Sequence, residues 1–408
     1  MISLKKDQIE RDDVMLAKNM KQKILRLVKA VWKNPELSGE EFFACAEQVR
    51  FLKKEGFTVT APIAGEKTAY KAEFTIGAKG KKHVPTFAFC SEYDALPKVK
   101  HGCGHPLIMG SALTAACCLR ELLKKDNIPG RVVLFGCPAE ETYGGKLKIA
   151  ESGAADDVDA FLMAHPTDGE VSFGDLGYAG VRYVNIAFTG SGGSGVPRLA
   201  NPSFVNTLDA STLLYQAVAM RRHFFPADVN IVGVITNGGE RANILPVVSE
   251  SSYTVRSQNI RRLEDYTQLL RSMAEAAAVL TGTEMTFTPG KFTPPTCHNM
   301  PLADAFLAGM EKRGGKIYRT LPHKGFLGAT DFGIFSRMRP GCHLHFPIME
   351  KNVAHHTIGF YQASGKTAAV DSMFAAGESM AETAFRFITD PKFRFAVEEE
   401  FTKVVSED

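Results

Sequence analysis

The sequence predicts an α/β fold in which a discontinuous domain is interrupted by a smaller α+β insert. Three observations support this prediction. Strands alternate with helices on short connections up to about residue 180, the order then becomes β-α-β-β-α-β, and α/β texture resumes near the C-terminus. We therefore expect one domain at residues 1–181 and 290–408 and an inserted domain at residues 182–289.

The N-terminal part of the chain has the pattern of helices packed on a largely parallel sheet. Residues 16–34 and 38–55 read as amphipathic helices, and Ser38 followed by Glu41 has the spacing of a capping box at the start of the second. Apolar runs then predict buried strands, and periodic segments between them predict helices. The expected order is strand 86–90, helix 107–124, strand 131–137, helix 144–152 and strand 158–165.

The insert begins with residues 182–189, which alternate between polar and apolar side chains as in a half-exposed strand. Its β-α-β-β-α-β order predicts a ferredoxin-like α+β unit with an antiparallel sheet. We expect helices at 204–223 and 262–281, and strands at 229–236, 248–257 and 284–288. The proline-rich segment 288–296 returns the chain to the first domain, with helix 301–313, strands 316–319 and 342–348, and helix 365–388.

Composition excludes several classes of protein. The 48 basic and 45 acidic residues give a net charge of +3, too small to favour nucleic acid or an anionic membrane as partner. The 45% apolar and 23% charged residues are values of a globular chain, and we find no apolar run of transmembrane length. The charged N-terminus lacks a signal core, and the eight cysteines include no CxxC pair. We expect a cytoplasmic protein with a helical N-terminal arm and free thiols.

A loop after the predicted strand 86–90 carries candidate metal ligands. In the segment HGCGH at 101–105, a thiolate and imidazoles are good ligands for zinc-like cations, and the glycines let Cys103 and His105 turn toward one point. A glycine loop around a buried thiol is the alternative interpretation. The segment by itself leaves both open.

Further candidates follow the next two strands. Glu140 and Glu141 in the segment PAEE suit a metal ligand and a proton-transfer group, but acidic residues after a proline are also typical of any helix start. His165 ends an apolar run, where a hydrogen-bonded core histidine is common, and the pair at 355–356 lies in a polar loop. Each of these signals is weak when it is taken alone.

The positions of these residues in the predicted fold support a metal centre more strongly than their chemical types do. Cys103, His105, Glu141 and His165 all lie just past the C-terminal ends of predicted parallel strands, the edge where open α/β sheets bind ligands. One thiolate, imidazoles and a carboxylate suit Zn²⁺ or Mn²⁺. The neighbouring Glu140 is then available as a general base for metal-activated water.

These segments resemble the aminoacylase/dipeptidase class of co-catalytic metallopeptidases, and within it the amidohydrolase branch of auxin-conjugate and p-aminobenzoyl-glutamate hydrolases. The resemblance covers nearly the whole chain. It implies a metallopeptidase-like catalytic domain and makes the insert a lid and dimerisation domain. It rests on NPELSGEE at 34–41, EYDALPKVKHGCGH at 92–105, CPAEETYGG at 137–145, AHP at 164–166, ERANILP at 240–246, SYTVRS at 252–257, ATDFG at 329–333 and AHHT at 354–357.

The resemblance also implies roles for individual residues. Glu140 would be the general base, which takes a proton from metal-activated water and returns it to the leaving amine. Asp94 would orient a metal ligand from behind. His356 is preferred to His355 because the family's histidine directly precedes the threonine that Thr357 matches. The implied ligands of one or two divalent ions, Mn²⁺ or Zn²⁺, are Cys103, His105, Glu141, His165 and His356; the implied substrate-binding residues are Ser194, Arg241, Asn243 and Arg256.

Two positions depart from the family pattern. Ser194 stands where relatives place a lid histidine that helps to hold the oxyanion, and loss of one such donor typically costs about 100- to 1,000-fold in rate. Either another donor, such as the glycine-rich backbone or Arg241, replaces it, or the reaction does not place its charge on a carbonyl oxygen. Pro106 stands where relatives carry Asp or Asn, which puts a second metal ion in question.

The sequence therefore predicts a metal-dependent hydrolase that cleaves a C–N bond, first of all the amide of a small N-acyl or aryl-amide substrate. The alternative is an aminohydrolase that removes the amino group of an activated aromatic amine of the nitroanthranilate type. Lesser alternatives are an inactive metallopeptidase-like binding protein and a thiol enzyme with Cys103 as nucleophile. The expected partners are a small-molecule substrate and a second copy of the chain, in a homodimer or higher homo-oligomer formed through the lid.

Overall fold

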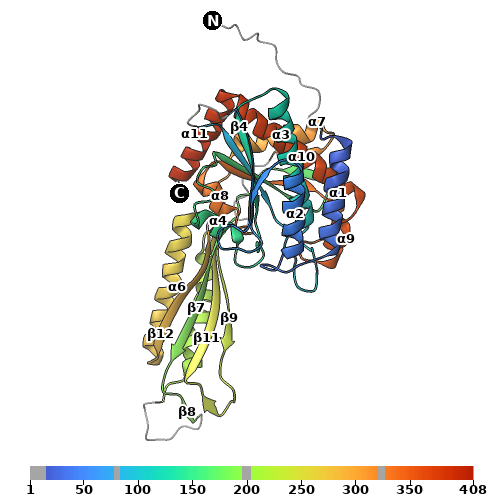
Figure 1. Ribbon diagram of the computed structural model, residues 1–408. Helices are drawn as coiled ribbons and strands as arrows, with labels where there is room; N and C mark the ends of the chain where they lie inside the picture. Colours follow the sequence, from blue (N-terminus) through green and yellow to red (C-terminus); the bar gives the residue numbers. More distant parts are fainter. Residues whose placement is uncertain (1–14, 78–82, 195–203, 320–326, 408) are drawn as a thin grey trace. The chain divides into compact units, whose positions relative to one another are not determined.

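A computed structural model describes residues 15–77, 83–194, 204–319 and 327–407 (Figure 1). The chain divides into two compact units. The larger unit contains Met1–Asp175, Asn299–Thr320 and Met338–Thr402, and the smaller unit contains Leu176–His298, Leu321–Arg337 and Lys403–Asp408. The expected N-terminal arm lies outside the described residues up to residue 14.

The smaller unit contains more of the chain than the insert expected at 182–289, because it runs from Leu176 to His298 and residues 327–337 also pack with it. Two hydrogen bonds explain this difference. The Arg337 Nε donates to the Pro295 oxygen at 2.8 Å, and the Ala179 nitrogen donates to the Gly328 oxygen at 2.8 Å. These contacts join parts of the chain that are far apart in sequence, which a pattern of helices and strands does not show.

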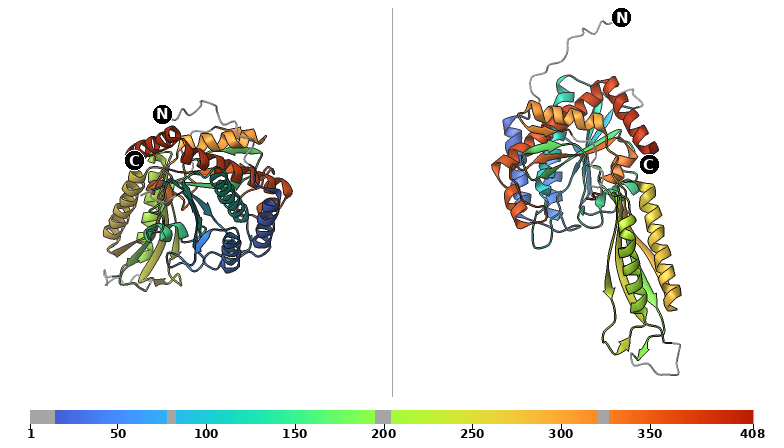
Figure 2. Two further views of the ribbon diagram at one scale, coloured as in Figure 1. Left: turned by 45° about the horizontal axis from the view of Figure 1, so that its top comes forward. Right: turned by 180° about the vertical axis from the view of Figure 1, so that it is seen from behind.

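The larger unit is built on a sheet covered by helices (Figures 1 and 2). The sheet has eight strands in the order β1-β2-β4-β3-β5-β14-β6-β13. β3, β4, β5 and β14 run parallel, while β1 and β2 are antiparallel additions at one edge. The carboxyl ends of the four parallel strands therefore meet at one edge of the sheet. The strands are β1 (Thr58–Thr60), β2 (Tyr70–Ile76), β3 (Thr86–Ser91), β4 (Gly130–Gly136), β5 (Ala160–Thr167), β6 (Val171–Phe173), β13 (Lys316–Tyr318) and β14 (Gly341–Pro347).

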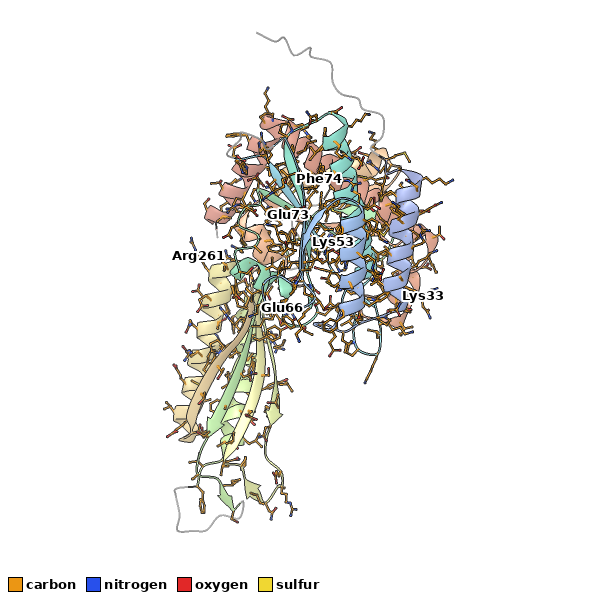
Figure 3. All side chains as sticks on the ribbon, viewed as in Figure 1. Lys33, Lys53, Glu66, Glu73, Phe74 and Arg261 are labelled. Atoms are coloured by element: carbon orange, nitrogen blue, oxygen red, sulfur yellow. The ribbon has the colours of Figure 1, made fainter. Side chains whose placement is uncertain are left out.

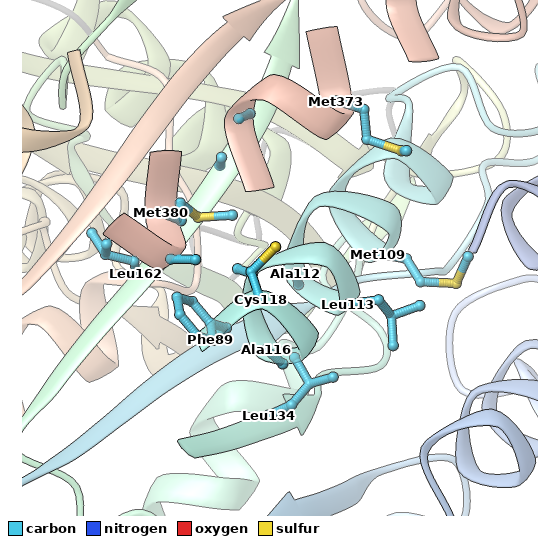
Figure 4. Packing of buried hydrophobic residues seen from close by; sticks show 14 of the residues in the cluster. Phe89, Met109, Ala112, Leu113, Ala116, Cys118, Leu134, Leu162, Met373 and Met380 are labelled. Atoms are coloured by element: carbon cyan, nitrogen blue, oxygen red, sulfur yellow. The ribbon is translucent and has the colours of Figure 1, made fainter. Parts of the chain in front are cut away.

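Helix α3 is the central helix of the larger unit. It packs on β3, β4 and β5 and against α10, and its residues Met109, Leu113 and Cys118 lie in the core (Figure 4). By length and composition α3 could cross a membrane, but 89% of its apolar window is buried inside the protein, which explains its composition as that of a core helix. The helices are α1 (Lys18–Lys33), α2 (Phe42–Lys54), α3 (His105–Lys125), α4 (Gly145–Glu151), α7 (Met300–Lys312), α9 (Ile358–Ser364), α10 (Thr367–Thr389) and α11 (Pro391–Glu407).

The start of α2 differs from the predicted capping box, which is wrong. The helix begins at Phe42, and neither Ser38 nor Glu41 caps it through its side chain. The carboxylate of Glu36 accepts hydrogen bonds from the first-turn nitrogens of Phe43 and Ala44 at 2.8 and 2.9 Å instead. At the other ends of α1 and α2, Lys33 and Lys53 (Figure 3) add positive charge near the exposed carbonyl groups, as helix termini prefer.

The smaller unit has the predicted ferredoxin-like α+β fold. Its antiparallel sheet has the order β12-β7-β11-β9, and α5 and α6 pack together on it around a core that includes Leu214, Tyr253 and Leu270. A further short ladder joins β8 to β10. The elements are β7 (Gly180–Thr189), β8 (Gly193–Ser194), α5 (Thr207–Arg221), β9 (Val229–Asn237), β10 (Ile244–Leu245), β11 (Val248–Ser257), α6 (Ile260–Thr281), β12 (Glu284–Thr293) and α8 (Gly333–Met338).

Candidate metal centre

The loop between β3 and α3 brings its two candidate ligands close to distant parts of the chain because it contains glycines. Gly104 has a φ of +83°, and a Cβ there would lie 2.7 Å from Cγ of Pro166. A Cβ on Gly102 would lie 3.1 Å from the Thr357 oxygen. The Gly102 oxygen also accepts a hydrogen bond from the His356 nitrogen at 2.9 Å. Only glycines let this loop lie directly against the neighbours of His165 and against His356 itself.

Cys103 and His165 meet within this packing. The Cys103 Sγ lies 3.4 Å from the His165 Nε2, while the His165 Nδ1 donates to the Pro166 oxygen at 2.7 Å. The proton on Nδ1 leaves Nε2 as a lone-pair donor that faces the thiol. Burial, reinforced by neighbouring histidines, holds the pKa of His165 well below its usual range, so the imidazole is neutral and able to bind a cation.

Asp94 orients His105, the second imidazole of the cluster. The His105 Nδ1 donates to Oδ1 of Asp94 at 2.8 Å, which directs Nε2 toward Cys103, Glu140 and Glu141. The other oxygen of Asp94 accepts from the Ser38 hydroxyl at 2.8 Å and from the Glu141 nitrogen at 3.1 Å. Burial opposes ionisation of Asp94, but the imidazole and these hydrogen bonds outweigh it and lower its pKa to about 2.

Glu141 and His356 complete the cluster from the opposite side. The Glu141 Oε1 lies 3.5 Å from the His356 Nε2 and 3.7 Å from the His105 Nε2. Cys103, Glu141 and His356 each offer a ligand atom within 4.8 Å of the others, as do Cys103, His105 and His165. The neighbouring His355 instead stacks on the ring of Phe360 at 4.2 Å. The structure thus brings together all five residues that the resemblance implied as ligands.

These residues fit a divalent cation. The His105 Nε2 and the Glu141 Oε1 are buried, and neither makes a hydrogen bond to any residue that the structure describes. A buried polar atom without a partner is costly and rare in native proteins. A thiolate, imidazoles and a carboxylate together are the donor set that Zn²⁺ and similar ions prefer. A bound cation would satisfy both atoms at once.

Glu140 lies at the edge of this cluster beside a second carboxylate, Glu92, which was not among the predicted site residues. Its Oε2 is 3.9 Å from the His105 Nε2, and its side chain is 15% exposed. Glu92, which is fully buried, offers an oxygen 3.7 Å from the same nitrogen and forms an ion pair with the buried Lys146. Glu92 directly follows β3, so its place at the strand end was a usable signal, whereas nothing in the sequence pointed to Lys146.

The four residues predicted to bind substrate all belong to the smaller unit. Ser194 lies in β8 opposite Ile244, while Arg241 and Asn243 are exposed between β9 and β10. Arg256 on β11 donates from Nη1 to the Leu327 oxygen at 2.8 Å. These four residues and the metal cluster thus belong to different units of the chain. The contact of the four residues with substrate stays a prediction.

Comparisons with known proteins agree with this geometry. The model of Peptidase family M20/M25/M40 matches residues 88–386. The Xaa-Arg dipeptidase of Mus musculus is 31% identical over 392 residues, which cover 94% of this chain and 89% of that protein. A p-aminobenzoyl-glutamate hydrolase chain of Escherichia coli K12 is 28% identical over 285 residues, 64% of this chain and 56% of that one.

A solved structure supports the fold. A dinuclear metal binding peptidase of Bacillus subtilis aligns with a TM-score of 0.70 at 21% identity, covering 91% of this chain and 99% of that one. The expected α/β fold and the expected branch of amidohydrolases and dipeptidases are confirmed. The comparisons lend no support to the alternative of aromatic deamination.

Proposed function

Because this chain belongs to peptidase family M20/M25/M40, a family of metal-dependent hydrolases, we propose that it cleaves the amide bond of a small N-acyl amino acid, aryl amide or dipeptide. The observation that carries this proposal is a second carboxylate beside a set of ligands. Glu140 offers an oxygen 3.9 Å from the His105 Nε2, and that nitrogen belongs to the cluster of Cys103 and His165. A hydrolase needs both parts, a cation site and a proton acceptor next to it.

The residues that would hold the cation are Cys103, His105, Glu141, His165 and His356. A divalent cation there supplies Lewis acidity to the water and to the substrate carbonyl. The protein's own residues perform the rest. Asp94 keeps the His105 Nε2 directed at the cation site, and Glu140 accepts a proton from the water and returns it to the leaving amine. Mn²⁺ and Zn²⁺ are the ions that we propose, because the donor set combines a thiolate, imidazoles and a carboxylate.

A homodimer formed through the smaller unit is also part of the proposal. β9 is an edge strand of its sheet, and Val232 and Val234 on it are 43% and 56% exposed. Phe224, just before this strand, is 77% exposed. Exposed apolar side chains on a sheet edge favour pairing with another chain. A cytoplasmic location is supported by eight cysteines that are all buried and free.

The test is a product-resolved screen on enzyme reconstituted with Mn²⁺ and, separately, with Zn²⁺. The substrates are dipeptides that end in arginine, p-aminobenzoyl-glutamate, N-acyl amino acids and nitro-substituted aromatic amines. We expect a carboxylate and an amine from at least one amide. Ammonia and a phenol from an aromatic amine, with every amide left intact, would overturn the proposal.

Two variants test the role of Glu140 on the amide that turns over fastest. Glu140→Gln keeps the shape of the side chain but removes its basicity, and we expect kcat to fall by about 100- to 10,000-fold with metal content unchanged. Glu151→Gln, at an exposed residue at the end of α4, is the matched control and should leave kcat unaltered. Undiminished turnover by the metal-loaded Glu140→Gln variant would remove Glu140 from the mechanism.

A further inference from the structure

We infer that Glu41 is a positioning residue for Glu140: its carboxylate fixes the backbone of Ala139 and thereby the direction in which Glu140 leaves the loop after β4. This inference rests on the role proposed above for Glu140. Glu41 lies in the segment NPELSGEE, which helped to identify the family but has no part in the chemistry derived so far.

The carboxylate of Glu41 is fully buried and holds two segments of the chain together. Its Oε1 accepts a hydrogen bond from the Ala139 nitrogen at 2.9 Å and another from the Gly39 nitrogen at 2.8 Å. Its Oε2 accepts from the Thr68 hydroxyl at 2.8 Å. Burial raises the pKa of Glu41, but these three donors favour its ionised form, and a hydrogen bond to a charged acceptor is stronger than one between neutral groups. Glu41 therefore binds firmly to the residue directly before Glu140.

Ala139 needs such a contact because of its backbone conformation. Its φ is +57°, in the left-handed region that is unfavourable for a residue with a Cβ, and its side chain is fully buried. The Ala139 oxygen accepts from the Gly144 nitrogen at 2.8 Å, so the turn is closed in this conformation. If the hold on its nitrogen were lost, the residue would relax toward common φ values and turn Glu140 away from the cluster.

The backbone is fixed on the other side of Glu140 as well. The Glu141 nitrogen donates to Oδ2 of Asp94 at 3.1 Å. Glu140 therefore lies between two peptide nitrogens that are each bound by a buried carboxylate, one from Glu41 and one from Asp94. Asp94 also orients His105. The two carboxylates thus place the general base and the metal ligand relative to each other.

Glu41 has one local contact through its carboxylate, the Gly39 nitrogen, which belongs to the turn before α2 and not to the helix. It precedes α2 but does not cap it, and Glu36 caps that helix instead through Phe43 and Ala44. Glu36 is consequently a matched control. Each carboxylate accepts two backbone N–H groups. Both donors to Glu36 belong to the first turn of α2, whereas one of the two donors to Glu41 is the Ala139 nitrogen in the loop that carries Glu140.

The first experiment compares Glu41→Ala, Glu41→Gln and Glu36→Ala, each loaded with Mn²⁺, on the amide from the panel above that the wild-type enzyme cleaves fastest. A displacement of about 1 Å in a catalytic group can cost about 100-fold in rate, so we expect kcat of Glu41→Ala to fall by at least about tenfold. KM and the metal content per chain should change little. Glu41→Gln keeps an oxygen that accepts both N–H groups and should keep kcat within about threefold of wild type. Glu36→Ala should lower the melting temperature but not kcat.

A second-site variant separates positioning from general stability. Ala139→Gly removes the Cβ that makes the left-handed conformation unfavourable. In the Glu41→Ala background we therefore expect it to restore kcat by about fivefold. Hydrogen–deuterium exchange gives a readout that does not depend on turnover: the peptide 138–144 should lose protection in Glu41→Ala and keep it in Glu36→Ala.

The inference is overturned if Glu36→Ala lowers kcat as much as Glu41→Ala, if Glu41→Ala keeps full kcat, or if Ala139→Gly restores nothing. If Glu41→Ala does not fold, Glu41→Asp takes its place, because it keeps the charge but is too short to reach the Ala139 nitrogen. Should the wild-type enzyme cleave no amide, the proposed function fails, while the exchange comparison still decides whether Glu41 holds the loop.

Discussion

Replacing Asp94 with asparagine tests how the metal centre is organised. The carboxylate accepts hydrogen bonds on both oxygens, from His105 on one and from Ser38 and Glu141 on the other. An asparagine amide has the same shape but only one accepting oxygen. If the NH₂ group of the asparagine faces the Glu141 nitrogen, two hydrogen-bond donors face each other. If it faces His105, the imidazole proton has to move to Nε2, the atom that would bind the metal.

Both orientations leave one buried hydrogen bond unmade. Such a loss costs about 1–3 kcal/mol, which corresponds to about 5- to 150-fold in an equilibrium constant. We therefore expect Asp94→Asn to weaken metal affinity by about 10- to 100-fold, in the range found for residues that orient a metal ligand. The measurement is competition between metal-free protein and a chromophoric chelator for Zn²⁺ at neutral pH, where the pKa of about 2 keeps Asp94 ionised in the wild type.

Ser38→Ala is the control for this variant. It removes one hydroxyl donor but leaves Asp94 ionised and bound to His105, so it should cost no more than about 1 kcal/mol, or about fivefold in affinity, and less than Asp94→Asn. Wild-type affinity in Asp94→Asn, or an equal loss in both variants, would refute the argument that Asp94 acts by orienting His105.

Three further predictions follow from the geometry. Gly104→Ala should weaken both metal binding and stability, because the new Cβ would lie 2.7 Å from Pro166. Gly56→Ala, which has a similar φ of +85° and no atom within 4 Å of the new Cβ, should lower stability only. Chelator competition measures the metal binding and thermal melting the stability of each variant. Removal of metal should lower the melting temperature, since the His105 Nε2 and the Glu141 Oε1 lose their partner, and equal melting with and without Zn²⁺ would contradict this. His345 lies buried on β14, where its Nδ1 donates to the Gly174 oxygen at 3.1 Å, and burial lowers its pKa to about 3. The stability that depends on its neutral form is therefore complete above its ordinary pKa of 6.5 and declines as the pH falls toward 3. The wild-type protein should therefore lose about 2 kcal/mol more unfolding free energy between pH 7 and pH 5 than His345→Asn does, as measured by urea titration. An equal loss in both proteins would contradict a lowered pKa of His345.

Much of the candidate site was predictable because the strands of the sheet can be recognised in the sequence and their direction determines where the following residues lie. Apolar runs marked β3, β4 and β5, and parallel strands place the residues after their carboxyl ends at one edge. Cys103, Glu141 and His165 could be brought together on that basis alone. The choice of His356 needed the resemblance, because its loop has no periodicity and both histidines there have similar local sequence.

The failures come from contacts between distant parts of the chain. The pattern of Ser38 and Glu41 matches a capping box, but the two side chains form hydrogen bonds with Asp94 and Ala139 instead, 56 and 98 positions away. Local propensity favours the cap only when no tertiary partner competes for the same oxygen atoms. The ion pair between Glu92 and Lys146 was missed for the same reason, since its partners are 54 positions apart.

X-ray absorption at the zinc edge tests the metal centre most directly, because it distinguishes sulfur from nitrogen and oxygen ligands. The enzyme loaded with Zn²⁺ should show a sulfur shell at about 2.3 Å together with nitrogen and oxygen ligands, and Cys103→Ser should lose that shell. A wild-type spectrum with no sulfur ligand would contradict the assignment of this cluster as the cation site on which hydrolysis depends.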